Sequence, residues 1–144
     1  KDGNINVSKF GPRIAGCGGF VNITQNAKRV YYCGTFTAGG LKCSTKDGKL
    51  IIDQEGKSDK FIDTVEQITF SGKYANKVGQ PVMYITERAV FELRNGVFTL
   101  TEIAPGVDLE KDVLGQMEFR PAIAEDLKLM DARLFTDEIM GLKA

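Results

Sequence analysis

The sequence predicts a strand-rich mixed α/β fold with antiparallel hairpins and few helices. Two observations lead to this prediction. Asp-Gly and Asn-Gly turn signals stand between runs of β-branched and aromatic residues, and only one stretch shows convincing helical spacing. The chain has 144 residues, 42% hydrophobic and 26% charged, which suffices for one domain with its own core. Residues 1–144 are therefore treated as a single region.

The first half of the chain predicts a strand followed by a hairpin. Residues 27–36 have a continuously apolar and aromatic centre, which is typical of a buried strand. Asp47 and Gly48 favour the positive φ angles of a tight turn. They predict a hairpin between a strand that ends near Cys43 and the run at 49–54.

The second half predicts a further hairpin and a further turn. Asn95 and Gly96 stand between residues 90–93 and 97–100, which should pair as antiparallel strands. The stretch QEGK at 54–57 is an additional turn signal.

Residues 108–118 are the one predicted helix. Asp108 is suited to the N-cap position and Glu110 to the first turn. Apolar residues recur at helical spacing at Leu109, Val113 and Met117.

Composition excludes several kinds of site. The sequence has no histidine, so this chain cannot by itself complete a Ser-His-Asp, Cys-His or His-ligated metal centre. Cys17, Cys33 and Cys43 are an odd number without CxxC spacing, which argues against a disulfide framework and favours a cytoplasmic location. No apolar run approaches the ~18 residues of a membrane span. Zero net charge does not indicate nucleic acid binding.

The first candidate site is the glycine-rich stretch at 13–24, with Gly16, Gly18 and Gly19. A dinucleotide-binding fingerprint fails because its third glycine would fall at Val21, with no convincing strand before it and no clear helix after it. A P-loop fails because no GK[ST] follows. Two interpretations remain: a loop whose N–H groups hold an oxyanion or carbonyl oxygen, and a tight turn without a ligand.

The second candidate site is the stretch GTFTAGGLK at 34–42, which follows the first predicted strand. Ligands gather at the carboxyl ends of strands in open α/β sheets. Gly39 and Gly40 would allow close approach there, and Lys42 offers a cation. Residues 1–49 carry eight basic and two acidic residues, a balance of +6, which favours an anionic ligand. A hairpin glycine pair with solvated charges is the alternative.

Glu87 and Arg88 stand between two apolar runs. A glutamate in this position could act as an acid, a base or a nucleophile. No second carboxylate stands at a defined spacing, so we favour a structural residue held by a local hydrogen bond or by Arg88.

Several stretches in order resemble the class I CoA-transferases: GCGGFVNIT, CGTFTAGGLK, VEQITFSGKYA and YITERAVFELRNGVFTLTEIAPG. The resemblance extends from about Gly3 to about Leu142 and is nearest to acetate, propionate and 3-oxoacid CoA-transferases with both halves in one polypeptide. It implies part of an open α/β fold. It also implies a ping-pong exchange through an acyl anhydride and a glutamyl-CoA thioester. Coenzyme A is then a substrate, and no permanently bound cofactor or metal is implied.

The resemblance also implies roles for the two glycine loops. Gly18 and Gly19 would present N–H groups to the oxyanion that forms when a thioester or anhydride carbonyl is attacked. The CoA would lie near Gly16, Gly39, Gly40 and Lys42.

One departure from the family pattern concerns the nucleophile. The family's nucleophilic glutamate lies upstream, in a glutamate-glycine motif that no glutamate of this chain matches. The chain also begins with KDGNIN rather than methionine. We therefore expect the carboxyl-terminal part of the catalytic half: a processed or truncated chain, inactive alone, that acts on acyl-CoA and carboxylates with its amino-terminal remainder, as a homo-oligomer. The alternatives are a non-catalytic CoA- or partner-binding module and an acyl-CoA hydrolase.

Overall fold

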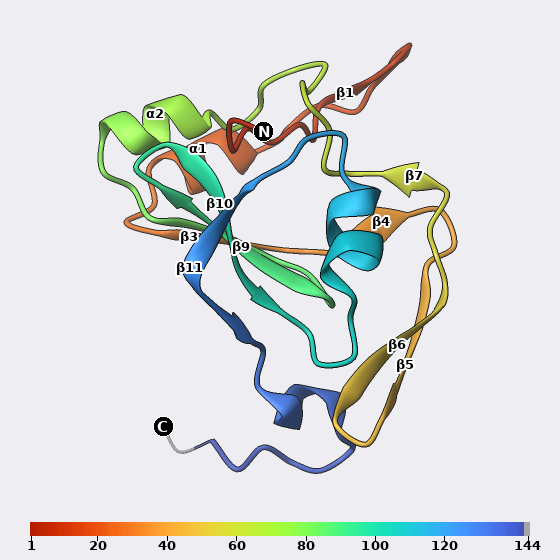
Figure 1. Cartoon of the computed structure of the whole chain (residues 1–144). Helices are drawn as coiled ribbons and strands as arrows, with labels where there is room; N and C mark the ends of the chain where they lie inside the picture. Colours follow the sequence, from red (N-terminus) through yellow and green to blue (C-terminus); the bar gives the residue numbers. More distant parts are fainter. Residues whose placement is uncertain (143–144) are drawn as a thin grey trace.

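A five-stranded mixed sheet forms the centre of the molecule (Figure 1). The computed structural model describes residues 1–142. Strand β9 pairs antiparallel with both β8 and β10, whereas the edge strands β3 and β11 run parallel to their neighbours. In the sheet order, the strands are β11 (Ala122–Leu129), β10 (Val97–Ile103), β9 (Ala89–Arg94), β8 (Val82–Ile85) and β3 (Val30–Cys33). The prediction of a strand-rich mixed α/β fold is confirmed.

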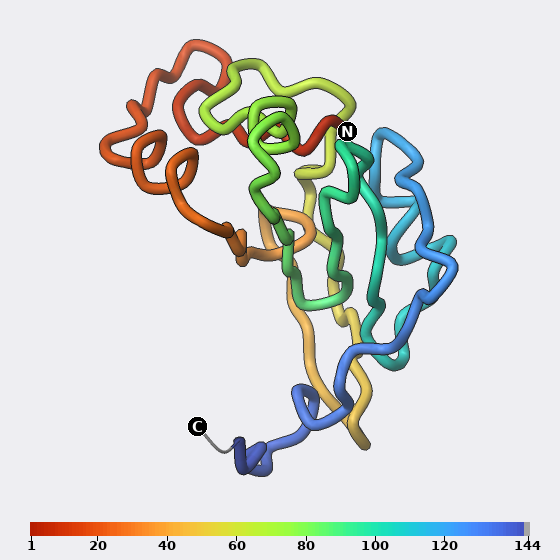
Figure 2. Tube along the Cα trace, turned by 90° about the vertical axis from the view of Figure 1, so that its left-hand side faces the viewer, coloured from red at the N-terminus to blue at the C-terminus, as the bar shows by residue number. Residues whose placement is uncertain are grey.

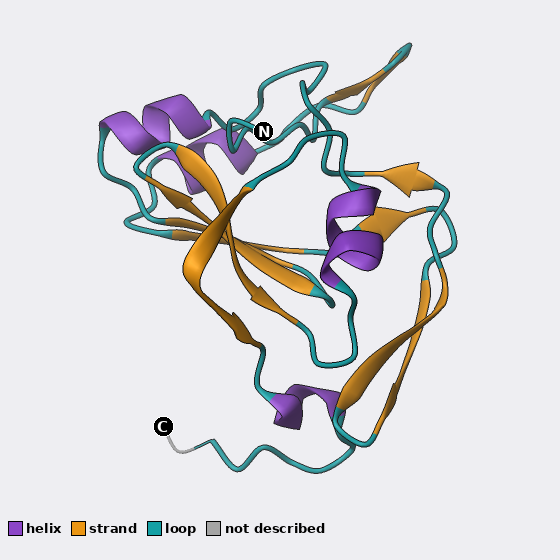
Figure 3. Ribbon diagram, viewed as in Figure 1, coloured by secondary structure: helices purple, strands orange, loops and turns teal. Residues whose placement is uncertain are grey.

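The remaining elements are short and lie around the sheet (Figure 3). Strands β5 and β6 form a long hairpin that extends away from it, called the arm below. Two further antiparallel pairs are β1 with β2 and β4 with β7. The bounds are β1 (Lys9–Phe10), β2 (Arg13–Ile14), α1 (Phe20–Gln25), β4 (Thr37–Ala38), β5 (Lys42–Lys46), β6 (Lys49–Gln54), β7 (Ser58–Asp59), α2 (Gly72–Lys77), the π-helical turn η1 (Leu109–Val113) and the 3-10 turns η2 (Leu114–Gln116) and η3 (Ala132–Phe135).

Apolar side chains cover both faces of the sheet. Because successive strand residues point to opposite faces, Phe91 packs in the main core and Val90 in a second cluster. Phe91 and Phe98 stack in the main core with ring centroids 4.8 Å apart. The second cluster includes Leu50 of β6, so it packs the arm against the sheet.

Both predicted hairpins are present. Asn95 and Gly96 have φ angles of +51° and +80° and join β9 to β10. The hairpin at Asp47 and Gly48 is also confirmed, with one correction. Its first strand continues to Lys46 instead of ending near Cys43, because Lys46 still pairs with Lys49.

Three other expectations are corrected. The strand expected at 27–36 is only Val30–Cys33, and it is an edge strand in which Val30 alone is fully buried. Asp108 does cap the helix expected at 108–118, accepting from the Lys111 N–H at 2.7 Å. In place of one α-helix, however, the structure has the two short turns η1 and η2, and these end at Gln116. A helix does follow the first glycine cluster, since α1 begins directly after it. None of the helices in residues 1–142 is long and apolar enough to cross a membrane.

Candidate functional site

The first glycine loop joins β2 to α1 and leaves backbone donors free. Gly18 has a φ of +50°, and Gly19 follows with φ −81° and ψ 2°. A left-handed residue followed by a right-handed one turns successive N–H groups toward one concavity. Within residues 1–142, no hydrogen bond uses the N–H of Gly18 or Gly19 as its donor. The loop therefore offers two free donors to a molecule outside this chain.

The second glycine loop is held by the last residue of the arm and by the segment that follows it. Gly39 and Gly40, with φ angles of +80° and +104°, join β4 to β5. The Gly39 carbonyl accepts from the Lys57 N–H at 3.3 Å, and the Gly40 carbonyl accepts from Gln54 Nε2 at 2.7 Å. Lys42 begins β5 two residues later and is exposed. This loop is braced through its carbonyls.

The structure does not bring the two loops together. The loop at 16–19 lies beside α1, and the loop at 39–42 lies at the base of the arm, so they stand apart in both views of the chain (Figure 1, Figure 2). The oxyanion role expected of the first loop and the CoA role expected of the second therefore fall in separate parts of this segment.

A cavity of about 640 Å³ is lined by residues that neighbour both loops in the sequence. Phe20, directly after the first loop, forms part of its wall, and so do Gly34 and Thr35, which precede the second. The rest of the lining comes from the N-terminal segment, from residues 59–68, and from the sheet and its surroundings, including Tyr32, Tyr84, Phe98 and Phe119. None of the six predicted site residues lines this cavity. Its volume lies in the range of small-molecule sites.

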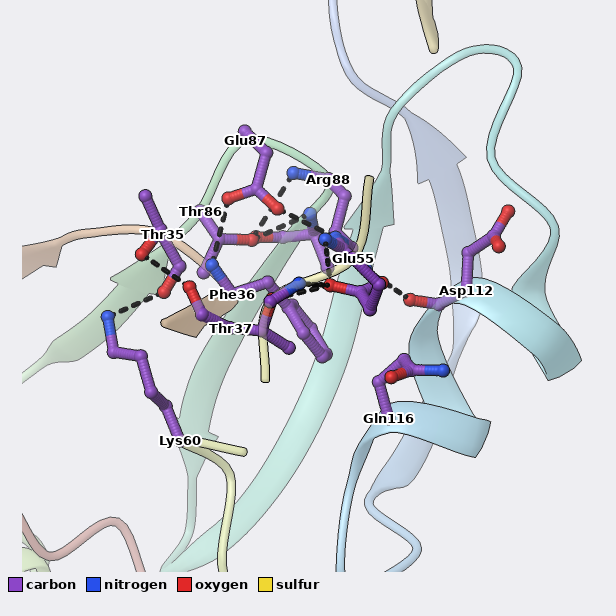
Figure 4. Close-up of polar contacts among 12 residues, drawn as sticks. Thr35, Phe36, Thr37, Glu55, Lys60, Thr86, Glu87, Arg88, Asp112 and Gln116 are labelled. Atoms are coloured by element: carbon purple, nitrogen blue, oxygen red, sulfur yellow. Dashed lines mark hydrogen bonds and ion pairs between the residues drawn. The ribbon is translucent and has the colours of Figure 1, made fainter. Parts of the chain in front are cut away.

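A buried ion-pair network, which the sequence did not predict as a unit, lies beside the second loop (Figure 4). Arg88 stands in the turn between β8 and β9, and its side chain has no exposed surface. Its guanidinium donates to Glu55 twice, at 2.6 and 3.0 Å, and to Glu87 at 2.6 Å. It also donates to the Asp112 carbonyl at 3.0 Å and lies over the Phe36 ring, 4.9 Å from its centroid. Arg88 thereby connects the sheet, η1 and the segment after the arm.

Glu87 has the structural role that its context favoured. One carboxylate oxygen accepts from Arg88, and the other accepts from the Phe36 N–H at 2.8 Å. With both oxygens engaged, Glu87 is held in place as expected.

Glu55 is the residue that sequence reasoning missed. It accepts from the Thr37 hydroxyl and from the Gly56 N–H at 3.0 Å, besides Arg88. Burial alone would raise the pKa of Glu55, but the hydrogen bonds from Arg88 and Thr37 outweigh it and lower this pKa to about 2. The sequence gives no signal for this pairing, because QEGK resembles a turn and Arg88 lies 33 residues away.

Gly56 explains why this segment can lie so close to β4. A Cβ at Gly56 would lie 2.5 Å from the Ala38 carbonyl oxygen and 2.5 Å from Thr37 Oγ1. The glycine of QEGK therefore serves close packing instead of a hairpin turn, which corrects the turn predicted at 54–57.

Comparison with known proteins identifies relatives of this chain. No protein-family model matches the chain. The chain is 54% identical, over 97% of its length, to the caffeate CoA-transferase of Acetobacterium woodii, and 55% identical, over 96%, to the acetate CoA-transferase YdiF of Escherichia coli K12. It covers 28% and 26% of those two proteins.

The solved structures agree with the sequences. The acyl-CoA transferase YdiF of E. coli O157:H7, in a thioester complex with CoA, matches 99% of the chain with a TM-score of 0.95 and 54% identity. The YdiF apoenzyme also gives a TM-score of 0.95. The chain covers 28% of each solved polypeptide. In sequence and in fold, the chain therefore corresponds to one segment of the CoA-transferases, the family that its sequence motifs resemble.

Proposed function

We propose that the chain is part of an enzyme that transfers CoA from an acyl-CoA to a short-chain carboxylate or 3-oxoacid. The nucleophile is a glutamate outside these 144 residues. The identity of 54–55% to enzymes named as CoA-transferases supports this assignment. One solved relative is described as a thioester complex with CoA, which is the kind of intermediate that the mechanism requires.

The exchange proceeds through two covalent intermediates, an acyl anhydride and a glutamyl-CoA thioester. The glutamate carboxylate attacks the thioester carbonyl, and the C–S bond breaks to give an acyl anhydride and CoA thiolate. The thiolate attacks the glutamyl carbonyl, which releases the first carboxylate and leaves a glutamyl-CoA thioester. An incoming carboxylate repeats these steps in reverse and leaves as the new acyl-CoA. Each attack places negative charge on a carbonyl oxygen.

The free donors of the first loop are the observation that carries the role of this segment. Within residues 1–142, the N–H groups of Gly18 and Gly19 have no acceptor, and the backbone there turns successive donors toward one concavity. Donors of this kind stabilise an oxyanion, and losing one typically costs about 10²–10³ in rate. The first loop thus supplies the oxyanion site.

The second loop supplies part of the CoA site. Its glycines leave the backbone open to close approach, and Lys42 offers a cation for a CoA phosphate. The basic balance of residues 1–49 acts in the same direction. Gly16, the first residue of the loop at 16–19, is also assigned to CoA binding.

The amino-terminal remainder of the enzyme completes the site and covers this segment. Strand β3 ends the sheet, and Tyr31 and Cys33 on it are exposed. An uncovered strand edge is a place for further pairing. The remainder brings the nucleophile toward the free donors of the first loop.

Intact-mass analysis of the full-length protein, under denaturing conditions, tests this function. After acetyl-CoA is added, we expect a covalent CoA adduct that disappears when acetate is supplied. Peptide mapping should place the adduct outside these 144 residues. Absence of an adduct would contradict the mechanism. Release of free acid and CoA at the same rate with and without acetate would identify an acyl-CoA hydrolase instead.

A further inference from the structure

We propose that Arg88 and Glu55 are positioning residues that hold the Gly39–Lys42 loop in place for CoA. This inference rests on the proposed function, because the second loop receives its CoA role there. Neither residue is given a contact with substrate. They act through the backbone of the segment between them and the loop.

The network starts from a rigid anchor. Arg88 is fully buried, and its backbone carbonyl accepts from the Ala104 N–H at 2.8 Å, beside β10. Its guanidinium also donates to the Asp112 carbonyl beside η1. The planar fork of an arginine can bond several acceptors at once, and a lysine cannot reproduce this geometry. Glu55 is therefore tied to two elements of the body through one side chain.

Hydrogen bonds then lead from Glu55 to β4. The Thr37 hydroxyl donates to Glu55 and accepts from the Gly56 N–H at 3.1 Å. Glu55 and Gly56 are thereby held against β4, the strand that leads into the second loop. Figure 4 shows Glu55 between Arg88 and Thr37.

The segment around Glu55 also bonds the loop itself. Gln54 donates to the Gly40 carbonyl, and the Lys57 N–H donates to the Gly39 carbonyl. The residues directly before and two positions after Glu55 are thus the ones that brace the two glycines. Fixing Glu55 against Arg88 fixes both braces.

The loop needs this support because the arm provides little. Every residue of β5 is exposed, and Leu50 is the one fully buried residue of β6. Two consecutive glycines are also costly to order, since glycine loses the most backbone freedom. Without the network, Lys42 would share the mobility of an exposed hairpin base.

The test uses the full-length transferase, with residues numbered as here. Glu55→Gln keeps one acceptor but removes the charge that pairs with Arg88. Thr37→Val removes the bridging hydroxyl at nearly constant shape, and Thr37→Ser retains it. Glu92→Gln is the matched control, because it removes an exposed ion pair with Arg94 on the same sheet.

Two readouts separate positioning from general stability. The first is hydrogen exchange of the Lys57 amide, which donates to Gly39, measured without CoA beside the amides of β9 and β10. The second is the division between KM for acyl-CoA and kcat. In Glu55→Gln and Thr37→Val we expect Lys57 exchange and KM to rise about tenfold, as for one lost hydrogen bond to a charged group. The kcat, the β9 and β10 amides, Thr37→Ser and Glu92→Gln should stay near wild-type values.

The outcomes distinguish this inference from the proposed function. Unchanged Lys57 exchange in both variants overturns the positioning role, and so does faster exchange spread equally over β9 and β10. Faster exchange confined to Lys57, with KM unchanged, supports the bracing of the loop and overturns the CoA role assigned to it. A rise in both quantities supports the inference and the proposed function together.

Discussion

The two glycine loops look alike in sequence and differ in how their backbones are bonded. Among the described residues, 1–142, none accepts from the N–H of Gly18 or Gly19, and none except its chain neighbours would lie within 4 Å of a Cβ at Gly18. At Gly39 and Gly40 the carbonyls accept hydrogen bonds from Lys57, after the arm, and from Gln54, the last residue of the arm. In the proposed function, the first loop would present its N–H groups to an oxyanion, whereas the second would hold Lys42 for CoA. Glycine content alone could not separate these tasks.

The difference also concerns what each loop depends on. The first loop follows a two-residue strand and precedes a six-residue helix, and it depends on its own dihedral angles. The second depends on a buried charge network anchored more than 30 residues away in the sequence. Damage to the network should therefore affect the second loop and spare the first.

Arg88→Met should have the largest effect, because it leaves Glu55 and Glu87 facing each other without their cation. Arg88 is fully buried but Glu55 and Glu87 are 30% and 20% exposed, so the cost should fall below the ~3–5 kcal/mol typical of a fully buried ion pair. The measurement is the free energy of opening from native-state hydrogen exchange of the β9 and β10 amides in the full-length protein.

The matched control is Arg94→Met, which removes an exposed pair with Glu92 and Asp126. Exposed pairs contribute about 0–1 kcal/mol, so little change is expected there. A loss below about 1 kcal/mol for Arg88→Met would mean that Arg88 stabilises the sheet no more than an exposed ion pair does.

Gly18→Val should lower kcat by about 10²–10³, since valine cannot keep a φ of +50° and the N–H groups would turn away. Gly19→Val keeps its φ but places a side chain beside the donors. Gly11→Val is the control, because Gly11 also has a positive φ, +57°, with nothing within 4 Å, and lies outside the loop. Normal turnover in both loop variants would contradict the oxyanion role of the first loop.

The stability contributed by Glu55 should depend on pH. Its folded pKa is about 2, below the ordinary 4.5, so this contribution is complete above about pH 4.5 and is lost as the pH falls toward 2. The full difference amounts to at most about 3 kcal/mol. The opening free energies of the Lys57 amide in wild type and in Glu55→Gln, measured from pH 6 to pH 3, should converge on acidification. A constant difference across this range would contradict the low pKa.

Local chemistry was the predictable part of this molecule. Asn95 and Gly96 define their hairpin because few other residues accept two positive φ angles in succession. Glu87 and Arg88 are sequence neighbours, so their pairing could be anticipated. Asp108 caps its helix through a bond to a residue three positions away.

The rest depended on tertiary contacts that leave no local pattern. Helix α1 has Gly19 at its N-cap without a side-chain cap bond, and no acidic residue in its first turn. The usual sequence signals of a helix start are therefore missing. The apolar run at 27–36 could not reveal that its strand ends the sheet. Glu55 was hidden because its partner comes from another strand connection.

Lys42→Ala should have the smallest effect and would sharpen the comparison most. Lys42 is an exposed cation at the end of the braced loop, so its removal leaves the network and the first loop intact. One charge-assisted contact with a CoA phosphate corresponds to about a tenfold rise in KM for acyl-CoA, with kcat unchanged. The rise should shrink as salt is added, because an exposed charge is screened.

Lys46→Ala is the matched control for this variant. Lys46 lies on the same strand, four residues on, beside the turn at Asp47 and Gly48. Its removal changes the net charge equally without touching the loop, so the KM should stay within about twofold of wild type. Equal effects of the two variants would mean that the basic strand attracts CoA only through its overall charge. A selective effect at Lys42 would mean that the braced loop holds one cation at a defined position.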